Sequence, residues 1–304
     1  MAMILFLSFK IKILFMLIII PSIFSLELPE QYDVREHYQC KSFDIIRNQQ
    51  NCGGCWAFAT AEVISDRICI SSKGKEQIII SEMELLTCCI TLNDDPLEAG
   101  CGGGDEYKAF KYWVDEGLSE SSCKPFLFAN GESPKDHIDK LYCRKYCDKY
   151  PLLRKKYFGS FFEIINNNEE DIKREIFYNG PVTAAYIAYK DFNDYWEILA
   201  SEPGKIYQHG SDDSDPEWHV IKIIGWGEDI IGGTIKKYWL CVNSWGTDEG
   251  HDGIFKFIRG INDCGIEAEV TAGYIIDKIL YENTKPIIVY EDHFFSFNNL
   301  KDDF

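Results

Sequence analysis

The residues best suited to chemistry lie in the segment from Gln49 to Phe58, which contains Cys52-Gly53-Gly54-Cys55. Cys55 stands directly before a run of apolar residues at helical spacing, so its thiol is expected at a helix N-terminus. A thiol is mostly protonated at neutral pH and attacks as the thiolate, which the partial positive charge of a helix N-terminus favours. A nearby imidazolium would favour it further. The pattern indicates nucleophilic attack by a cysteine.

Sequence periodicity predicts the helices and strands around these residues. Residues 56–69 contain no Gly or Pro and predict a helix that begins at about Cys55. Ser81-Glu82-Met83-Glu84 is a capping-box pattern for a second helix, and residues 107–114 predict a third. Strands are expected at 219–226, 238–243 and 253–258, whereas 121–160 is loop-rich. A helical first half and a β-rich second half predict two lobes, at about 38–150 and 151–276.

The segment around Cys55 resembles the active-site signature of papain-like cysteine peptidases, although Gly54 stands where that family usually has Ser or Ala. Several other segments resemble the cathepsin B-like branch: Leu28-Pro29, Tyr32-Asp33-Val34-Arg35-Glu36, residues 64–69, Leu85-Leu86-Thr87-Cys88-Cys89 and residues 264–269. The resemblance covers roughly residues 28–275. It implies an α+β fold with a helical N-terminal lobe, a β-barrel-like C-terminal lobe and an active-site cleft between them.

The resemblance also implies catalytic roles. Cys55 would be the nucleophile, His219 its base, and Asn243 the residue that orients the imidazole. Gln49, together with the backbone N–H of Cys55, would stabilise the oxyanion. Trp245 would shield the His219–Asn243 contact beside the bound substrate. The order Cys, His, Asn and the long separation suit two lobes that meet at a cleft.

Further positions match substrate-binding residues of the family. Gly103 and Gly104 match a pair whose backbone meets an extended substrate, although an ordinary tight turn after Cys101 would use the same residues. Glu269 matches an acidic residue at the base of the second specificity pocket, where it would pair with an Arg side chain. For an isolated Glu near a strand end, a solvated surface role is the plainer interpretation.

The chain has 12 cysteines, all after residue 25, and in an exported protein that indicates disulfides. By the resemblance they pair as Cys40–Cys69, Cys52–Cys101, Cys88–Cys143 and Cys123–Cys147, which leaves Cys55, Cys89, Cys241 and Cys264 free. Alternatively, Cys52 and Cys55 form a thioredoxin-type redox pair at a helix start. That alternative does not account for Gln49, Trp56, His219 or Asn243-Ser244-Trp245.

The chain also departs from the cathepsin B pattern. Between Cys123 and Cys143 it has only His137, so the histidine-bearing occluding loop is expected to be absent and the activity to be that of an endopeptidase. Glu217-Trp218 replace two glycines before His219, where the indole would narrow the cleft and the carboxylate would raise the histidine's pKa. Glu249 stands where a second shielding Trp is usual. The alternative function is a weak or inactive homologue that binds peptides or inhibitors.

The N-terminal sequence and the net charge indicate where the protein is located and what it binds. Lys10 and Lys12 precede the apolar run 13–20, Pro21 and the small Ser25, so residues 1–25 are predicted to be a signal peptide. The predicted signal peptide leads almost directly into Leu28-Pro29, so either the protein needs no propeptide or the sequence is incomplete.

A net charge of −18 argues against nucleic acid or anionic membrane as partners. We expect a peptidase domain at 26–276, an acidic tail at 277–304, and a secreted or lysosomal location. The expected partners are protein or peptide substrates and cystatin-type inhibitors, with no cofactor or metal.

Overall fold

The computed structural model describes residues 27–89, 100–128, 132, 142–144, 146–147, 155–165, 167–211, 213–248 and 250–275. The predicted signal peptide, the tail 277–304, His137 and Glu249 lie outside the described residues. The helices are α1 (Cys55–Ser71), α2 (Glu82–Cys88), α3 (Glu106–Glu116), α4 (Glu169–Asn179) and α5 (Lys190–Leu199). None of the helices in these ranges is long and apolar enough to cross a bilayer.

The strands join into one mixed sheet. They are β1 (Tyr32–Asp33), β2 (Phe161–Ile165), β3 (Val182–Ala188), β4 (Ile206–Tyr207), β5 (Glu217–Ile231), β6 (Thr234–Val242), β7 (Ile254–Ile258) and β8 (Val270–Tyr274). Their order is β2-β8-β3-β5-β6-β7-β4, with β1 paired to β5. All pairs are antiparallel except β4 with β7. The helices and this sheet give the α+β architecture expected from the sequence.

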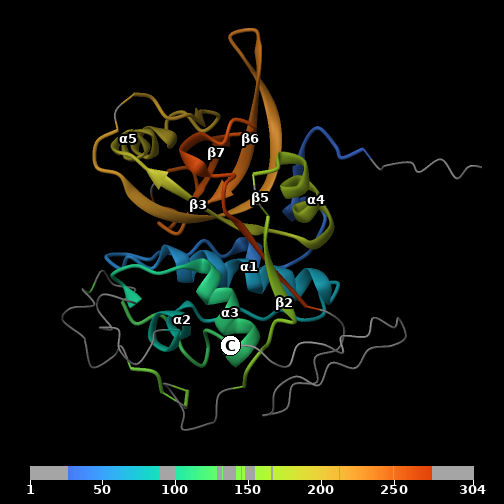
Figure 1. Ribbon diagram of the computed structural model, residues 1–304, viewed down its shortest axis with the longest axis vertical. Helices are drawn as coiled ribbons and strands as arrows, with labels where there is room; N and C mark the ends of the chain where they lie inside the picture. The colour runs from blue at the N-terminus through green and yellow to red at the C-terminus, as the bar shows by residue number, and fades with distance from the viewer. Residues whose placement is uncertain are drawn as a thin grey trace, which may run out of the picture.

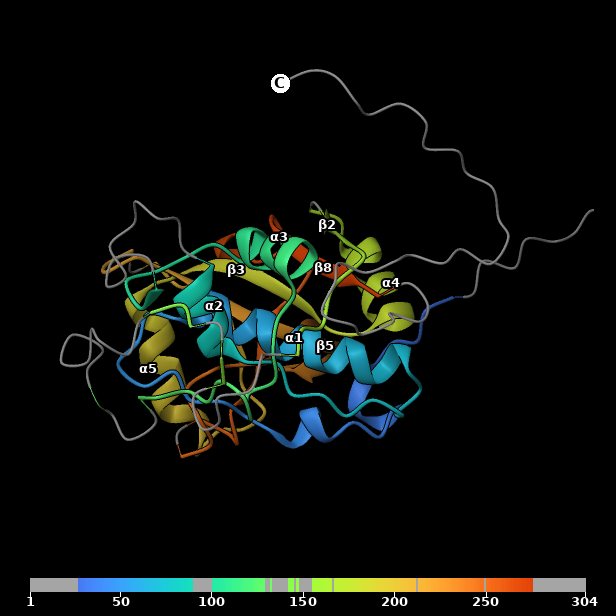
Figure 2. The ribbon, with the colours of Figure 1, turned by 90° about the horizontal axis from the view of Figure 1, so that it is seen from below.

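Two hydrophobic cores lie on opposite sides of α1. The first packs α4 and α5 against β3 and β5–β7 and includes Trp196, Trp226 and Trp239. The second packs α1, α2 and α3 together and includes Phe58 and Trp113. Figure 1 shows α1 between these two parts, with α2 and α3 below it and most of the strands above it, and Figure 2 gives the view from below, with α2 and α3 toward the viewer. The fold is therefore two lobes that share α1.

Because α1 contacts both lobes, its charged residues must be paired inside the protein. Lys222 of β5 lies 3.3 Å from Glu62 and 2.9 Å from Asp66, and all three side chains are buried. Arg47 completes the group by pairing with Glu62 and Glu82. Burial lowers the pKa of Lys222, but Asp66 and Glu62 outweigh that effect and raise it above its ordinary value, which keeps the lysine charged. These ion pairs connect α1 to β5.

The predicted helix starts agree closely with the structure. Helix α1 begins at Cys55, and Ser81 caps α2 by accepting from the N–H of Glu84. The reciprocal half of the capping box does not form, because the Glu84 carboxylate instead accepts from Ser119 and pairs with Lys156. In the second half, helices α4 and α5 were not expected from the sequence. The β-rich half therefore also contains helices, which cover its sheet.

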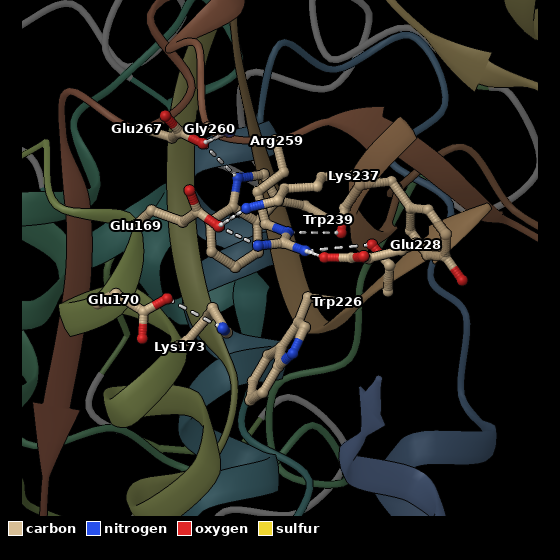
Figure 3. A network of polar contacts seen from close by, with 12 residues as sticks. Glu169, Glu170, Lys173, Trp226, Glu228, Lys237, Trp239, Arg259, Gly260 and Glu267 are labelled. Carbon is tan, nitrogen blue, oxygen red and sulfur yellow. Dashed lines mark hydrogen bonds and ion pairs between the residues drawn. The ribbon is translucent and has the colours of Figure 1, made fainter. Parts of the chain in front are cut away.

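Arg259, directly after β7, organises a polar network inside the β-rich lobe (Figure 3). Its guanidinium pairs with Glu169 and Glu228, and it donates to the carbonyls of Tyr238 and Gly227. It also lies 5.5 Å from the centre of the Trp239 ring. One side chain thus joins the start of α4 to three strands of the sheet.

We expect Arg259→Ala to lower the free energy of unfolding by about 2–4 kcal/mol, because buried carbonyls lose their donor and the carboxylates their counter-ion. Urea denaturation measures this loss. The matched control is Arg174→Ala, since Arg174 is 56% exposed and its ion pair is with Asp171 on its own helix. That variant should lose less than about 0.5 kcal/mol. Equal losses in the two variants would contradict the assigned role of Arg259.

Candidate active site

The Cys55 thiol lies where α1 meets β5. Cys55 is the first residue of α1 and is partly buried. Burial raises the pKa of this thiol, and the nearby backbone N–H groups of Val220, Trp56 and Cys55 itself oppose that rise. Val220 follows His219 on β5, so the structure brings the thiol of one lobe against the histidine-bearing strand of the other.

The His219 ring is fixed by a short polar chain. Asn243 Oδ1 lies 2.8 Å from His219 Nε2 and also accepts from the backbone N–H of Ser244 at 2.8 Å. Because a backbone N–H can only donate, this contact fixes the orientation of the Asn243 amide. His219 Nε2 must then carry the proton, and Nδ1 is left as the nitrogen that can accept one. The Trp245 ring lies 5.1 Å from the imidazole and covers the site from one side.

Gln49 is held between the lobes. Its Oε1 accepts from the Ser244 hydroxyl at 2.5 Å, and its Nε2 donates to the carbonyl of Cys52 at 2.9 Å. The backbone N–H of Gln49 also donates to the Ser244 carbonyl at 2.8 Å. The Gln49 amide therefore points its NH₂ group toward the chain that precedes Cys55, and one of its two N–H bonds remains to donate to a ligand.

The glycine pair lies beside this group. Gly103 has φ +135°, which strains an L side chain, and the space where a Cβ would stand is open. A Cβ on Gly104 would overlap the Trp56 indole. Glu269 is exposed, and its carbonyl accepts from the N–H of Ala185 on β3 at 3.3 Å. All the predicted site residues therefore lie around the junction of α1, the start of α3 and the sheet.

Burial dominates the protonation of the thiol and the imidazole. It raises the pKa of Cys55 to about 11, against the three N–H groups that lower it. It lowers the pKa of His219 to about 4, against the Asn243 hydrogen bond. Glu217 is not among the groups that shift the pKa of His219, so the expected rise caused by that carboxylate is not found. At Cys55 the backbone N–H groups lower the pKa, but burial outweighs them. A lone charge is unfavourable on either group, so a proton transfer that charges both together is the favourable route.

Trp218 does not pack into the protein beside His219. Its side chain is 71% exposed, in contrast to the buried His219. Trp218 pairs in register with Ile187 at the end of β3. The indole is therefore a surface group at the edge of the site.

Comparison with known proteins agrees with this geometry. The family model described as papain family cysteine protease matches residues 28–274. The cathepsin B-like cysteine proteinase 6 of Caenorhabditis elegans is 37% identical over 272 residues, which cover 82% of this chain and 67% of the relative. A cathepsin B-like cysteine proteinase of Schistosoma japonicum is 36% identical over 272 residues, covering 83% of this chain and 74% of the relative.

The chain belongs to the papain family of cysteine proteases.

Within the papain family the chain is cathepsin B-like. A procathepsin B structure from Trypanosoma congolense superposes with a TM-score of 0.69 at 35% identity, covering 82% of this chain and 78% of that one. The likeness to cathepsin B that the sequence suggested is thereby confirmed, as are the two-lobe α+β fold and the assignment as a cysteine peptidase. The proposed domain boundaries stay predictions.

This papain-family chain has four disulfides in its structure, Cys40–Cys69, Cys52–Cys101, Cys88–Cys143 and Cys123–Cys147. They are the pairs that the resemblance implied. Cys55 is a free thiol, as are Cys89, Cys241 and Cys264. Since Cys52 is bonded to Cys101, the thioredoxin-type pairing with Cys55 is excluded. No group of three or more His, Cys, Asp or Glu residues in the described ranges is arranged to hold a metal.

Two residues of the site were not singled out from the sequence. Ser244 orients Gln49 and Asn243 at once, although only its place between Asn243 and Trp245 pointed to it. Glu106, the first residue of α3, is 7% exposed and is electrostatically coupled to Cys55. A Glu in the first turn of a helix is an ordinary pattern, so nothing in the sequence alone indicated that this one is buried at the site.

We expect Gln49→Ala to lower kcat by about 10²- to 10³-fold, because one oxyanion donor is removed. Steady-state kinetics on a fluorogenic peptide measures the effect, with circular dichroism to confirm folding. Gln31→Ala is the matched control: Gln31 is an exposed glutamine, and its kcat should stay within about twofold of the native value. A Gln49 variant with native kcat would refute the assignment of this amide to the oxyanion site.

Proposed function

We propose that this protein is a cysteine endopeptidase that hydrolyses peptide bonds through Cys55, His219, Asn243 and Gln49. The observation that carries the proposal is the arrangement around His219. Asn243 Oδ1 lies 2.8 Å from His219 Nε2. The N–H of the next residue, Val220, opposes the rise in the Cys55 pKa that burial causes, so the thiol lies near this strand. The imidazole is thus oriented with a basic nitrogen available beside a nucleophile.

In the first half-reaction the Cys55 proton passes to His219 Nδ1, and the sulfur attacks the peptide carbonyl carbon. The developing oxyanion accepts from the backbone N–H of Cys55 and from the Gln49 amide. His219 then gives its proton to the leaving nitrogen as the C–N bond breaks. The products are a thioester on Cys55 and a free amine.

In the second half-reaction a water replaces the amine. His219 takes a proton from this water as its oxygen attacks the thioester carbonyl. The C–S bond breaks, the proton returns to Cys55, and a carboxylic acid leaves. Asn243 keeps the same imidazole orientation in both halves, since its own amide is fixed by Ser244. The reaction needs no group beyond these side chains and water.

The proposed substrate preference rests on Gly103, on Glu269 and on the segment between Cys123 and Cys143. Gly103 leaves open space next to an extended backbone, so a substrate strand can approach it. Glu269 would bind a cationic side chain in the second specificity pocket. Because His137 is the one histidine between Cys123 and Cys143, no histidine pair would grip a C-terminal carboxylate, which supports cleavage within chains. A secreted or lysosomal location and inhibition by cystatin-type proteins are part of the same proposal.

The direct test is hydrolysis of an N-acyl-Phe-Arg coumarin amide by the native protein and by Cys55→Ala under reducing conditions. We expect turnover in the native protein and loss of at least about 10³-fold in the variant, which lacks the nucleophile. Cys89→Ala, which removes another partly buried free thiol, should keep native turnover. A folded native protein without turnover would favour the alternative role in peptide or inhibitor binding.

The pH profile of the same reaction follows from burial of the pair. In the active form, Cys55 and His219 together carry one proton. At acid pH His219 binds a second proton, which blocks its action as a base. Because the pKa of His219 is lowered to about 4, kcat/KM should rise as pH increases through about 4. Since the pKa of Cys55 is raised to about 11, it should not fall before strongly alkaline pH. An acid limb near about 6.5, the ordinary histidine value, would contradict this account.

A further inference from the structure

Glu106 is a buried carboxylate that the proposed mechanism does not use. It follows the helix cap Asp105, whose own carboxylate accepts from the N–H groups of Tyr107 and Lys108. Glu106 is 7% exposed. Its carboxylate accepts from its own backbone N–H, and in the described part of the chain no cationic side chain forms an ion pair with it.

The surroundings of Glu106 place it at the substrate side of the site. It interacts electrostatically with Glu269, which comes from the turn before β8, and with Cys55 at the start of α1. The N–H of Ala185 on β3 donates to the Glu269 carbonyl at 3.3 Å, and Ala185 pairs in register with Val220 of β5, the residue after His219. Ala109 and Phe110 of α3, the helix that Glu106 begins, are buried in the same apolar cluster as Ala185 and Val220. Glu106 and Glu269 therefore approach the same region from α3 and from the turn before β8.

A buried carboxylate without a cationic partner is costly to ionise, and a second carboxylate nearby increases that cost. A ligand that carries a positive charge removes both penalties at once. Guanidinium groups suit this arrangement best, because their five donors can serve two carboxylates in one plane. The arrangement thus fits a cationic side chain of a substrate.

We propose that Glu106 is a second carboxylate of the specificity pocket of Glu269, and that the two together bind the Arg or Lys side chain two positions before the cleaved bond. The inference rests on the proposed function, since the pocket is defined relative to attack by Cys55. It assigns to Glu106 a role in specificity and none in the bond-breaking steps.

Protonation makes this pocket sensitive to pH. Burial, Asp105 and Glu269 raise the pKa of Glu106 to about 7, against the hydrogen bond from its own N–H. The charged groups that face it are Asp105 on its own turn, Glu269 before β8 and the Cys55 thiol on α1. Glu106 is therefore neutral in acid and ionised above neutrality, so preference for a cationic side chain should increase as pH rises through about 7.

The test compares kcat/KM for N-acyl-Arg-Arg and N-acyl-Phe-Arg coumarin amides at pH 5 and pH 8. In the native protein we expect the Arg-Arg to Phe-Arg ratio to rise between these pH values. Glu106→Gln keeps the shape of the side chain without the charge, so at pH 8 it should lower the ratio by about tenfold and abolish the rise. Glu116→Gln, at the exposed far end of α3, is the matched control and should behave as native.

A Glu106→Gln protein with the native ratio, or with the native rise between pH 5 and pH 8, would overturn the inference. A separate readout uses calorimetry on the Cys55→Ala background with uncleaved N-acyl-Arg-Arg-amide and N-acyl-Phe-Arg-amide. There Glu106→Gln should weaken binding of the Arg-Arg peptide at pH 8 by about tenfold relative to the Phe-Arg peptide. This effect, combined with no turnover by the native protein, would support the pocket while refuting the peptidase mechanism, and equal loss for both peptides would overturn the pocket.

Discussion

The active site depends on how α1 is held against β5. Cys55, Glu62 and Asp66 are spaced by seven and four residues, so they lie along one face of α1. Lys222 of β5 binds Glu62 and Asp66 at 3.3 and 2.9 Å, two residues beyond Val220, whose N–H opposes the rise in the Cys55 pKa that burial causes. The same helix face and the same strand thus carry both the buried ion pairs and the reacting groups. Because ions buried between lobes lose much of their solvation, the pairs favour the one alignment in which every charge is matched.

Electrostatics at the site follows from the same burial. A thiolate or an imidazolium alone would be poorly solvated there, which is why the pKa values of Cys55 and His219 move in opposite directions. Formed together, the two charges compensate each other. Asn243 and Ser244 add orientation without charge, since each contributes neutral donors and acceptors with fixed geometry. In the proposed mechanism the site combines a charge pair that forms during the reaction with neutral hydrogen-bonding groups that are already in place.

Much of this could be predicted from sequence because the signals are local. The start of α1 at Cys55, the Ser81 cap and the strand after His219 all follow from short patterns, and the motifs around Cys55, His219 and Asn243 identified the family. Helix α5 was missed although Phe192, Tyr195, Trp196 and Leu199 have helical spacing and are all buried. By contrast, Ser244 and Glu106 owe their roles to contacts between segments far apart in the chain. The burial that inverts the expected pKa shifts of Cys55 and His219 likewise comes from the opposite lobe, and no local pattern encodes it.

The central claim is that the Cys55 sulfur forms a covalent bond to the substrate acyl group. Acid quenching during turnover of an N-acyl-Phe-Arg nitrophenyl ester, followed by proteolysis and mass spectrometry, would locate that bond directly. We expect the acyl mass on the peptide that contains Cys55, and its loss in His219→Ala, which cannot accept the thiol proton. An acyl group found instead on Cys89 or Cys264, or steady hydrolysis with no acylated cysteine at any quench time, would contradict it.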